Sequence, residues 1–226
     1  KKIDIMHTEI RFYPTELLPG SEMATTESRK KFNIKSAYRK IHGFNKDFGD
    51  ISGCEYQEII ISTNTFSFSD YIYVRKLHYF ICLFATYSIY GPIVDLYLSK
   101  NHEHSFVWVI NKLIDAMETG FRVRNTDTNL LSELFKEITA EVTNELTPAK
   151  EFNENKDSML YQGGTTKRIN IFYIITLLYG KEGRYRKAFS KLIRGIFIDN
   201  SLCKASEIDN NLEQIEDIII DYNKIQ

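Results

Sequence analysis

Arg75 and His78 offer the most chemistry in this chain, because they lie three residues apart in an otherwise apolar stretch. At that spacing the two side chains share one face of a helix. A cation inside a buried helix needs a carboxylate partner or a polar cavity. Two interpretations stay open: a salt bridge to a carboxylate such as Glu58 or Glu22, or a pocket that binds a substrate or an anion. Either arrangement can include basic residues of the preceding segment, namely Arg29 and Arg39.

Three other patterns suggest chemistry, and each has a simpler interpretation that we favour. His102 and His104 could hold a metal, but no third ligand is near in sequence, which favours a solvated helix entrance. Residues 163–167, Gly-Gly-Thr-Thr-Lys, resemble a phosphate loop but lack its glycine spacing, which favours a flexible loop before a helix. Cys54 and His42 are of the types used as nucleophile and base, but nothing orients them.

Composition narrows the class of protein. The chain has 226 residues, 43% of them hydrophobic and 26% charged, which is ordinary for a soluble globular protein with one good core. A net charge of -1 argues against a globally basic nucleic-acid binder. The longest apolar stretch, residues 71–90, is interrupted by charged residues and predicts a buried helix instead of a membrane span.

The cysteines indicate a reducing compartment. Cys54, Cys82 and Cys203 are scattered and odd in number, which predicts reduced thiols in a cytoplasmic protein. The amino-terminal residues show no secretory signal. Because no two cysteines lie within five residues of each other, this chain does not hold a conventional iron–sulfur cluster by itself, and it offers no metal or other cofactor site.

The elements that would position these residues change in kind along the chain. Residues 1–16 alternate in a strand pattern with apolar groups on both faces, Pro19-Gly20 marks a turn, and residues 25–31 suit a short helix. Residues 33–54 look irregular, and residues 57–62 predict a second strand. An exposed strand at residues 1–16 would pair with its copy in a second chain, so we expect a homodimer through it.

Helices follow from residue 66. Ser67 to Asp70 fits a capping box before the helix at residues 71–90, which Gly91-Pro92 breaks or ends. Residues 147–167 are polar and predict a long mobile loop. A second capping box, Ser206 to Asp209, opens the last helix. Further apolar stripes at helical spacing lie within residues 107–117, 131–142, 169–179, 185–196 and 208–222.

The predicted fold is therefore mainly α with a small α+β amino-terminal portion. A helical, bundle-like carboxy-terminal domain, residues 66–226, follows one or two strands and an irregular linker in residues 1–65.

Several segments of residues 8–98 also resemble a known family. Residues 17–23, Leu-Leu-Pro-Gly-Ser-Glu-Met, look like the segment that follows a late barrel strand in radical S-adenosylmethionine enzymes, particularly those with a cobalamin-binding domain. The chain departs from the family at residues 43–49, where the family usually has a sequence similar to Pro-Arg-Cys-Phe-Gly. The resemblance continues at Arg29, Tyr38-Arg39, Phe48-Gly49, Glu58-Ile59-Ile60, residues 62–65, residues 67–71 and residues 75–78.

The resemblance implies that this chain is the carboxy-terminal region of such an enzyme, with residues 1–16 as its last barrel strand. Its cluster-binding barrel, which in the family uses an iron–sulfur cluster, S-adenosylmethionine and in these members cobalamin, would belong to missing amino-terminal domains of the same polypeptide. The region would be non-catalytic and would close and shape the substrate site. Its candidate pocket residues are Glu22, Arg39, Arg75 and His78.

A different class of function stays open beside it. The helices could form a self-contained module that binds a protein or an apolar ligand in a groove between them.

Overall fold

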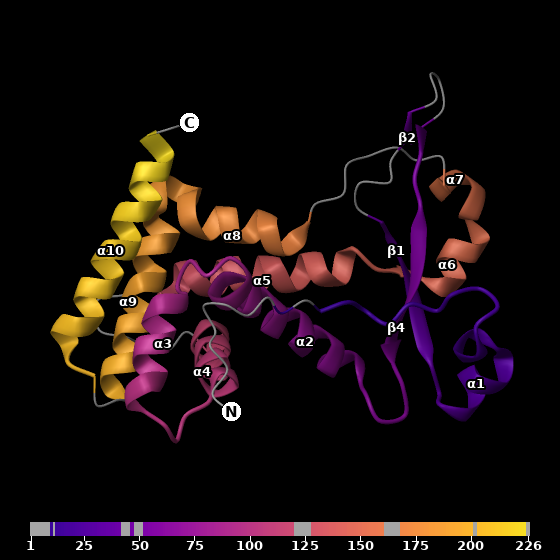
Figure 1. Cartoon of the computed structure of the whole chain (residues 1–226). Helices are drawn as coiled ribbons and strands as arrows, with labels where there is room; N and C mark the ends of the chain where they lie inside the picture. The colour runs from indigo at the N-terminus through magenta and orange to yellow at the C-terminus, as the bar shows by residue number, and fades with distance from the viewer. Residues whose placement is uncertain are drawn as a thin grey trace. The chain divides into compact units, whose positions relative to one another are not determined.

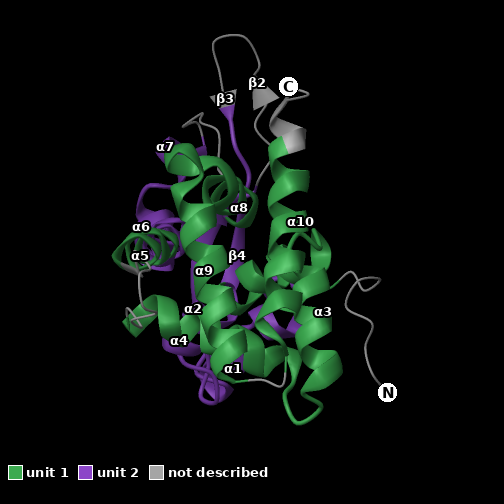
Figure 2. Ribbon diagram, turned by 90° about the vertical axis from the view of Figure 1, so that its left-hand side faces the viewer, with its two compact units in different colours: residues 1–11, 76–138, 170–226 green, residues 12–75, 139–169 purple. Residues whose placement is uncertain are grey.

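Residues 10, 12–41, 46–47, 52–119, 128–160, 168–200 and 203–224 are described by the computed structural model. They are mainly helical with a small antiparallel sheet, which confirms the predicted fold class. Two compact units alternate along the sequence (Figure 2): unit 1 comprises residues 1–11, 76–138 and 170–226, and unit 2 comprises residues 12–75 and 139–169. The expected domains 1–65 and 66–226 follow a different division, which these units do not test.

The sheet of unit 2 is built on β1, Lys35–Lys40, which pairs on one side with β4, Tyr56–Ser62, and on the other with β5, Thr147–Pro148. All pairings are antiparallel, and Figure 1 shows β1 and β4 side by side. Two shorter strands, β2 (Lys46–Asp47) and β3 (Ser52–Gly53), pair separately. The expectation that residues 33–54 are irregular was therefore wrong for β1, whose polar side chains conceal its strand pattern.

The other edge of β4 is lined by residues 15–17. Glu16 forms an isolated bridge with Ile59, while Leu17 N donates to Glu58 O at 2.9 Å and Ile60 N donates to Thr15 O at 2.9 Å. Most of the expected strand at residues 1–16 lies outside the described residues, and residues 12–15 are not strand. Leu17 is buried, whereas a set of nearby apolar side chains is exposed: Phe12, Tyr13, Leu18 and Met23.

Short helices complete unit 2. The 3-10 turn η2, Glu22–Ala24, precedes α1, Thr26–Lys31, whose N-cap Thr25 accepts a hydrogen bond from Ser28 N, as residues 25–31 predicted. The expected loop at residues 147–167 was wrong for its first part, where α6 (Ala149–Glu154) and α7 (Lys156–Leu160) follow β5. These helices form because Phe152 is buried and stacks on the ring of Tyr38, with centroids 3.9 Å apart. Residues 161–167 lie outside the described part.

Helix α2, Phe68–Ile81, begins with the predicted capping box: Asp70 accepts from Ser67 N at 2.8 Å, and Ser67 Oγ accepts from Asp70 N at 3.2 Å. It continues as a π-helical turn, Cys82–Thr86, and Gly91 then starts α3, Gly91–Lys100. A Cβ on Gly91 would lie 2.7 Å from Phe84 O, so only glycine fits there. Proline at the first turn starts a helix as readily as it ends one, which is why α3 was missed.

The remaining helices belong to unit 1, apart from the last part of α5 and the first residue of α8, and enclose an aromatic core. Phe84 and Tyr90 are fully buried against Phe189, with ring centroids 6.4 and 5.2 Å away, and Phe80 stacks on Phe84. The helices predicted from apolar stripes are confirmed: α4 (Phe106–Thr119), α5 (Thr128–Asn144), α8 (Ile169–Tyr179), α9 (Arg184–Asp199) and α10 (Ala205–Lys224), with a 3-10 turn, η4 (Gly180–Gly183), between α8 and α9.

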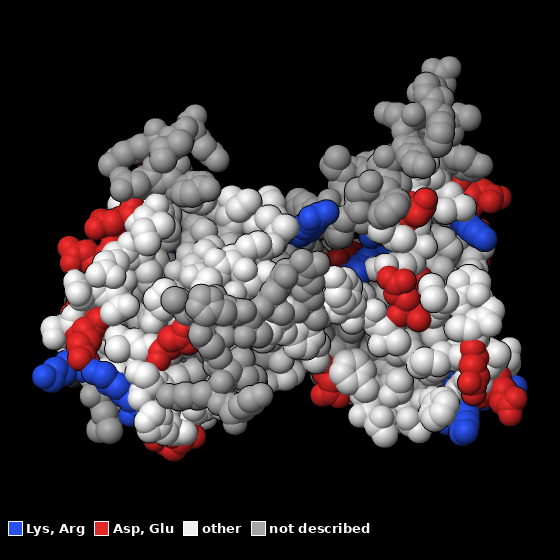
Figure 3. Space-filling model, viewed as in Figure 1, with Lys and Arg blue, Asp and Glu red and all other residues white. Residues whose placement is uncertain are grey.

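Helix α10 is joined to α9 and α3 by ion pairs. Arg186, on α9, is buried and donates from Nε and Nη2 to the two carboxylate oxygens of Glu216, both at 2.8 Å. Acidic side chains gather along α10 on the face shown in Figure 3. The predicted capping box of Ser206 and Asp209 was wrong, because Glu207 accepts from Lys204 N at 3.2 Å while Asp209 pairs with Arg194 on α9.

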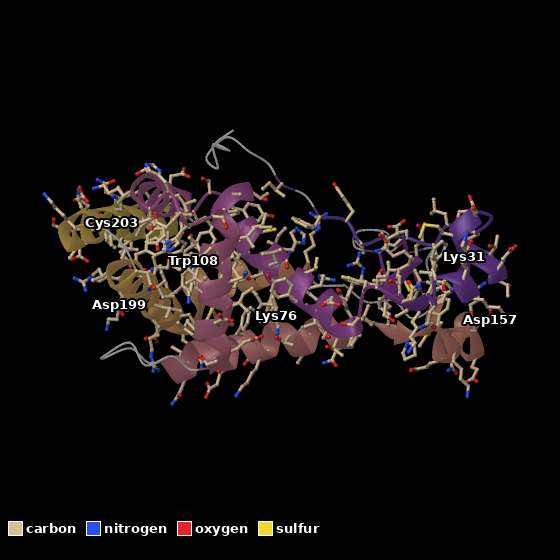
Figure 4. The ribbon with its side chains drawn as sticks, turned by 90° about the horizontal axis from the view of Figure 1, so that it is seen from below. Lys31, Lys76, Trp108, Asp157, Asp199 and Cys203 are labelled. Carbon is tan, nitrogen blue, oxygen red and sulfur yellow. The ribbon has the colours of Figure 1, made fainter. Side chains whose placement is uncertain are left out.

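A stack of rings joins α3 to the start of α4. His104 lies flat against Trp108, with centroids 3.6 Å apart, and its Nδ1 is 2.7 Å from the hydroxyl of Tyr97. The same hydroxyl donates to Asn200 O at 3.0 Å. Trp108, labelled in Figure 4 within unit 1, is the only tryptophan of the chain.

Candidate functional site

The register of β1 and β4 separates their polar residues onto the two faces of the unit 2 sheet. Tyr38 pairs with Glu58, and Arg39 pairs with Gln57. Because side chains alternate along a strand, Tyr38 and Glu58 lie on one face and Arg39 and Gln57 on the other. Each face carries an ionic network, and the two networks differ in how completely their charges are paired.

On the first face, Arg29 forms a two-pronged contact with Glu58. Its Nη1 and Nη2 donate to the two carboxylate oxygens at 2.7 and 2.8 Å, and its Nε donates to Ala24 O at 3.1 Å. Ser36 Oγ donates to the same carboxylate and accepts from Arg29 Nη1 at 3.1 Å. Burial would raise the pKa of Glu58, but the hydrogen bonds from Arg29 and Ser36 outweigh it and hold that pKa below its ordinary value. We call Arg29 and Glu58, together with the adjoining Ser36, the Glu58 pair.

On the second face, two arginines contact one carboxylate. Glu145, directly after α5, pairs with Nη1 of Arg75 and lies 3.6 Å from Nη1 of Arg39. Nη1 of Arg75 also donates to the hydroxyl of Tyr71, one helical turn earlier, at 3.0 Å. The side chains of Arg39, Arg75 and Glu145 are 14%, 13% and 13% exposed, so the group is largely but not completely buried. We call these four residues the Glu145 cluster.

Two members of the Glu145 cluster have shifted pKa values, Arg75 and Tyr71. Burial tends to lower the pKa of Arg75, but the neighbouring Glu145 carboxylate outweighs it and leaves that pKa above its ordinary value. Burial raises the pKa of Tyr71, so its hydroxyl keeps its proton at neutral pH.

Gln57 extends the cluster toward the sheet edge. With its amide oriented to satisfy both ends, its oxygen accepts from Arg39 Nε at 2.9 Å and its nitrogen donates to the carboxylate of Glu16. Glu16 is exposed to solvent, and its carboxylate is connected to Arg39 through the amide of Gln57.

The structure brings together two of the four predicted pocket residues. Arg39 and Arg75 meet at Glu145, whereas Glu22 is exposed in η2, where its backbone carbonyl accepts from Thr25 Oγ1 at 2.8 Å. His78 belongs to unit 1, where its Nδ1 lies 3.2 Å from the amide nitrogen of Asn170. The salt-bridge interpretation of Arg75 had named Glu58 or Glu22, but the partner is Glu145.

Glu145 is the residue that the sequence interpretation missed. An acidic residue just after a helix faces the negative end of the helix dipole and therefore needs a cation close by. That signal was present directly after α5. What was absent from the sequence was any indication of which arginine supplies the cation.

The described residues give no support to the candidate metal, phosphate or nucleophile sites. His102 and Glu103 are exposed, while His104 bonds to Tyr97, and within the described ranges no group of three or more His, Cys, Asp or Glu could hold a metal ion. His42 and residues 163–167 lie outside the described residues. Cys54 is buried, and its thiol donates to Met159 O at 3.2 Å.

In the part of the chain that the structure describes, no single helix has both the length and the apolar composition to cross a membrane. The helices Phe68–Thr86 and Gly91–Lys100, bent by 92°, meet those criteria only as a pair.

Comparison of the chain with protein-family models and with curated protein sequences finds no match.

Proposed function

We propose that this chain is the non-catalytic carboxy-terminal region of a cytoplasmic radical S-adenosylmethionine iron–sulfur enzyme of the cobalamin-binding type, and that it closes and shapes the substrate site of a catalytic barrel elsewhere in the same polypeptide. The observation that carries the proposal is that, in the described part of unit 2, residues of the resembling segments take part in most of the ionic contacts.

Those contacts join distant parts of the resemblance to one another. Arg29 binds Glu58, and Arg39 meets Arg75 at Glu145. Ser67 and Asp70 cap the helix that carries Arg75. Several positions that resemble the family thus make contacts within unit 2, which supports a shared scaffold more than a shared reaction centre.

The exposed apolar side chains near the sheet edge support a docking surface for the barrel. Tyr13 is 76% exposed and Leu18 is 60% exposed, beside the segment that pairs with β4. A contiguous patch of exposed apolar side chains is typical of an interaction site. The docking surface comprises Phe12, Tyr13, Leu18 and Met23.

The cysteines of this chain do not fit an iron–sulfur cluster. Cys54 is in unit 2, and Cys82 and Cys203 are in unit 1, where the amide of Asn170 contacts Cys82 and that of Asn101 contacts Cys203. The proposal therefore assigns the cluster, S-adenosylmethionine and cobalamin to the barrel, and assigns substrate contacts to Arg39 and Arg75, with Glu22 and His78 as further candidates.

The complete reading frame tests the proposal. We expect three closely spaced cysteines upstream of Lys1, and we expect the full-length protein, purified without oxygen and reconstituted with iron and sulfide, to cleave S-adenosylmethionine to 5′-deoxyadenosine. Arg75→Gln should leave that cleavage intact, because Arg75 is assigned to substrate and not to the cluster. A full-length protein without the cysteines or the cleavage would overturn the proposal.

The alternative function is a self-contained module that binds a protein or an apolar ligand, favoured by exposed apolar side chains in unit 1. Ile175 on α8 is 53% exposed and Ile218 on α10 is 67% exposed. A barrel domain expressed separately would distinguish the two. Tyr13→Ser with Leu18→Ser should weaken its binding to this chain, whereas Ile175→Ser with Ile218→Ser should not; a barrel domain that does not bind the unmodified chain would favour the module.

A further inference from the structure

We propose that Arg75, with Arg39 beside it, forms a binding site for the carboxylate group of a small molecule, which sits on the Nε–Nη2 edge of Arg75, and that Glu145 shares the same two cations from the Nη1 end. As a substrate site, the assignment rests on the proposed function; as a carboxylate site, it rests on the geometry of unit 2 alone.

The first argument is the way Arg75 uses its donors. Both of its hydrogen bonds come from Nη1, one to Glu145 and one to Tyr71. Its Nε and Nη2 have no hydrogen-bond partner within the described ranges. Neither nitrogen is among the fully buried side-chain atoms that lack a hydrogen bond in the described residues, so the Nε–Nη2 edge of Arg75 is partly exposed.

The second argument is a comparison with other arginines of the chain. Arg29, Arg186 and Arg194 each place two nitrogens on the two oxygens of one carboxylate. Arg186 and Arg194 do so through the Nε–Nη2 edge, which is the edge that Arg75 leaves open. The planar guanidinium fork matches a carboxylate in this two-pronged geometry. An open fork on a largely buried arginine is thus the unused half of a carboxylate contact.

The third argument is charge. Two guanidinium groups converge on one oxygen of Glu145, and the 3.6 Å from Arg39 exceeds an ordinary hydrogen bond. Glu16 adds its charge only from the exposed side of Gln57. Because the two largely buried cations share one close carboxylate, an additional anion here is electrostatically favourable.

Tyr71 helps to fix the orientation of Arg75. Its hydroxyl oxygen accepts from Nη1 of Arg75 at 3.0 Å, and the same nitrogen pairs with Glu145. Because both contacts hold the Nη1 end of the guanidinium group, the Nε–Nη2 edge is left for a planar two-oxygen group.

Titration of the isolated chain tests the site. Succinate would be titrated by calorimetry at constant ionic strength, with inorganic phosphate as the second probe. We expect saturable succinate binding to the unmodified chain and weaker phosphate binding. Arg75→Lys should weaken succinate binding about tenfold, since lysine keeps the charge but loses the fork. The matched control Arg194→Lys changes an exposed arginine with the same fork geometry and should bind as the unmodified chain does.

Glu145→Gln gives the opposite expectation. Removing the carboxylate that neutralises the two cations should strengthen succinate binding about threefold or more, because both cations lose their close anion while an amide of the same size remains. A Glu145 that only holds the fold together would give equal or weaker binding in this variant.

The assignment is overturned if the unmodified chain does not bind succinate, if phosphate binds as tightly, or if Arg75→Lys binds like the unmodified chain. Protection of Arg75, but not of Arg194, from phenylglyoxal by succinate gives a readout that needs no variant. Because neither measurement uses S-adenosylmethionine, succinate binding by a chain whose reading frame lacks the upstream cysteines would overturn the proposed function and leave the carboxylate site standing.

Discussion

The two faces of the unit 2 sheet carry the same kinds of groups in different proportions. In the Glu58 pair, one arginine faces one carboxylate, both carboxylate oxygens are used, and a serine fills the remaining space. In the Glu145 cluster, two arginines share one carboxylate oxygen, and one arginine keeps an open edge. The first arrangement is closed, whereas the second has capacity for another group.

The difference suggests how function can be separated from stability in this unit. A complete ion pair loses its partner when either residue is removed, so each residue is needed for folding. A shared carboxylate still has a cation after one substitution, which leaves its residues freer to serve a ligand. This difference between the two faces can be tested by measuring the free energy of unfolding after charged residues are removed from each face.

The largest effect is expected for the double variant Arg39→Met with Arg75→Met. Each single variant should lower the free energy of unfolding by about 1 kcal/mol, because Glu145 keeps one cation. The double variant leaves that carboxylate largely buried and unpaired, and should cost about 3 kcal/mol, more than the sum of the two. Urea unfolding of all four proteins measures the coupling; additive costs would contradict the sharing of Glu145.

The next effect is that of Arg29→Met alone. Glu58 has no second arginine, so this single substitution should lower the free energy of unfolding by about 2 kcal/mol. Arg194→Met, which breaks an exposed two-pronged pair, should cost about 0.5 kcal/mol and serves as the control. Equal losses in the two urea-unfolding curves would show that the Glu58 pair behaves as an ordinary surface pair.

Ser36→Ala should have a smaller effect, about 1 kcal/mol, because it removes one hydrogen bond to a carboxylate that keeps its arginine. Thr65→Ala, which changes an exposed hydroxyl outside both networks, is a suitable comparison in the same thermal or urea unfolding. A loss as large as that of Arg29→Met would mean that the serine, and not the arginine, holds the carboxylate.

The smallest effect is the dependence on pH. Because the folded pKa of Glu58 is lowered, its stabilising contribution is complete above its unfolded pKa of about 4.3 and is lost as the pH falls through the folded value. Below about pH 5 the free energy of unfolding should therefore fall more steeply for the unmodified chain than for Glu58→Gln, which has no carboxylate to protonate at this position. Parallel pH profiles for the two proteins would contradict this. The exposed Glu213→Gln controls for the general effect of acid.

The fold was predictable where the signal is local. The capping box of Ser67 and Asp70 spans four residues, and the stripe of α4 lies on one face, so both can be identified without knowledge of the rest of the chain. Strand β1 could not be identified in this way. Its polar side chains, Ser36 and Arg39 among them, are satisfied by partners from distant segments, so the strand lacks an apolar face that would reveal it.

The site was half predictable for the same reason. A charged residue in an apolar helix announces that it needs a partner, and Arg75 was recognised on that ground. The identity of the partner depends on where the end of α5 lies against β1 and α2, which is a tertiary fact. His78, three residues from Arg75, belongs to the other compact unit. Helical spacing predicts that two side chains share a face of the helix, but it does not predict which neighbours each of them contacts.

The stack of His104 on Trp108 has a practical consequence. Since the chain has one tryptophan and it lies in unit 1, tryptophan emission observes that unit alone, and unit 2 contributes only tyrosine signal. The imidazole of His104 lies in face-to-face contact with the indole, so this emission also reports whether that contact persists. The chain therefore carries a built-in optical label that separates unfolding of its two units without any added dye.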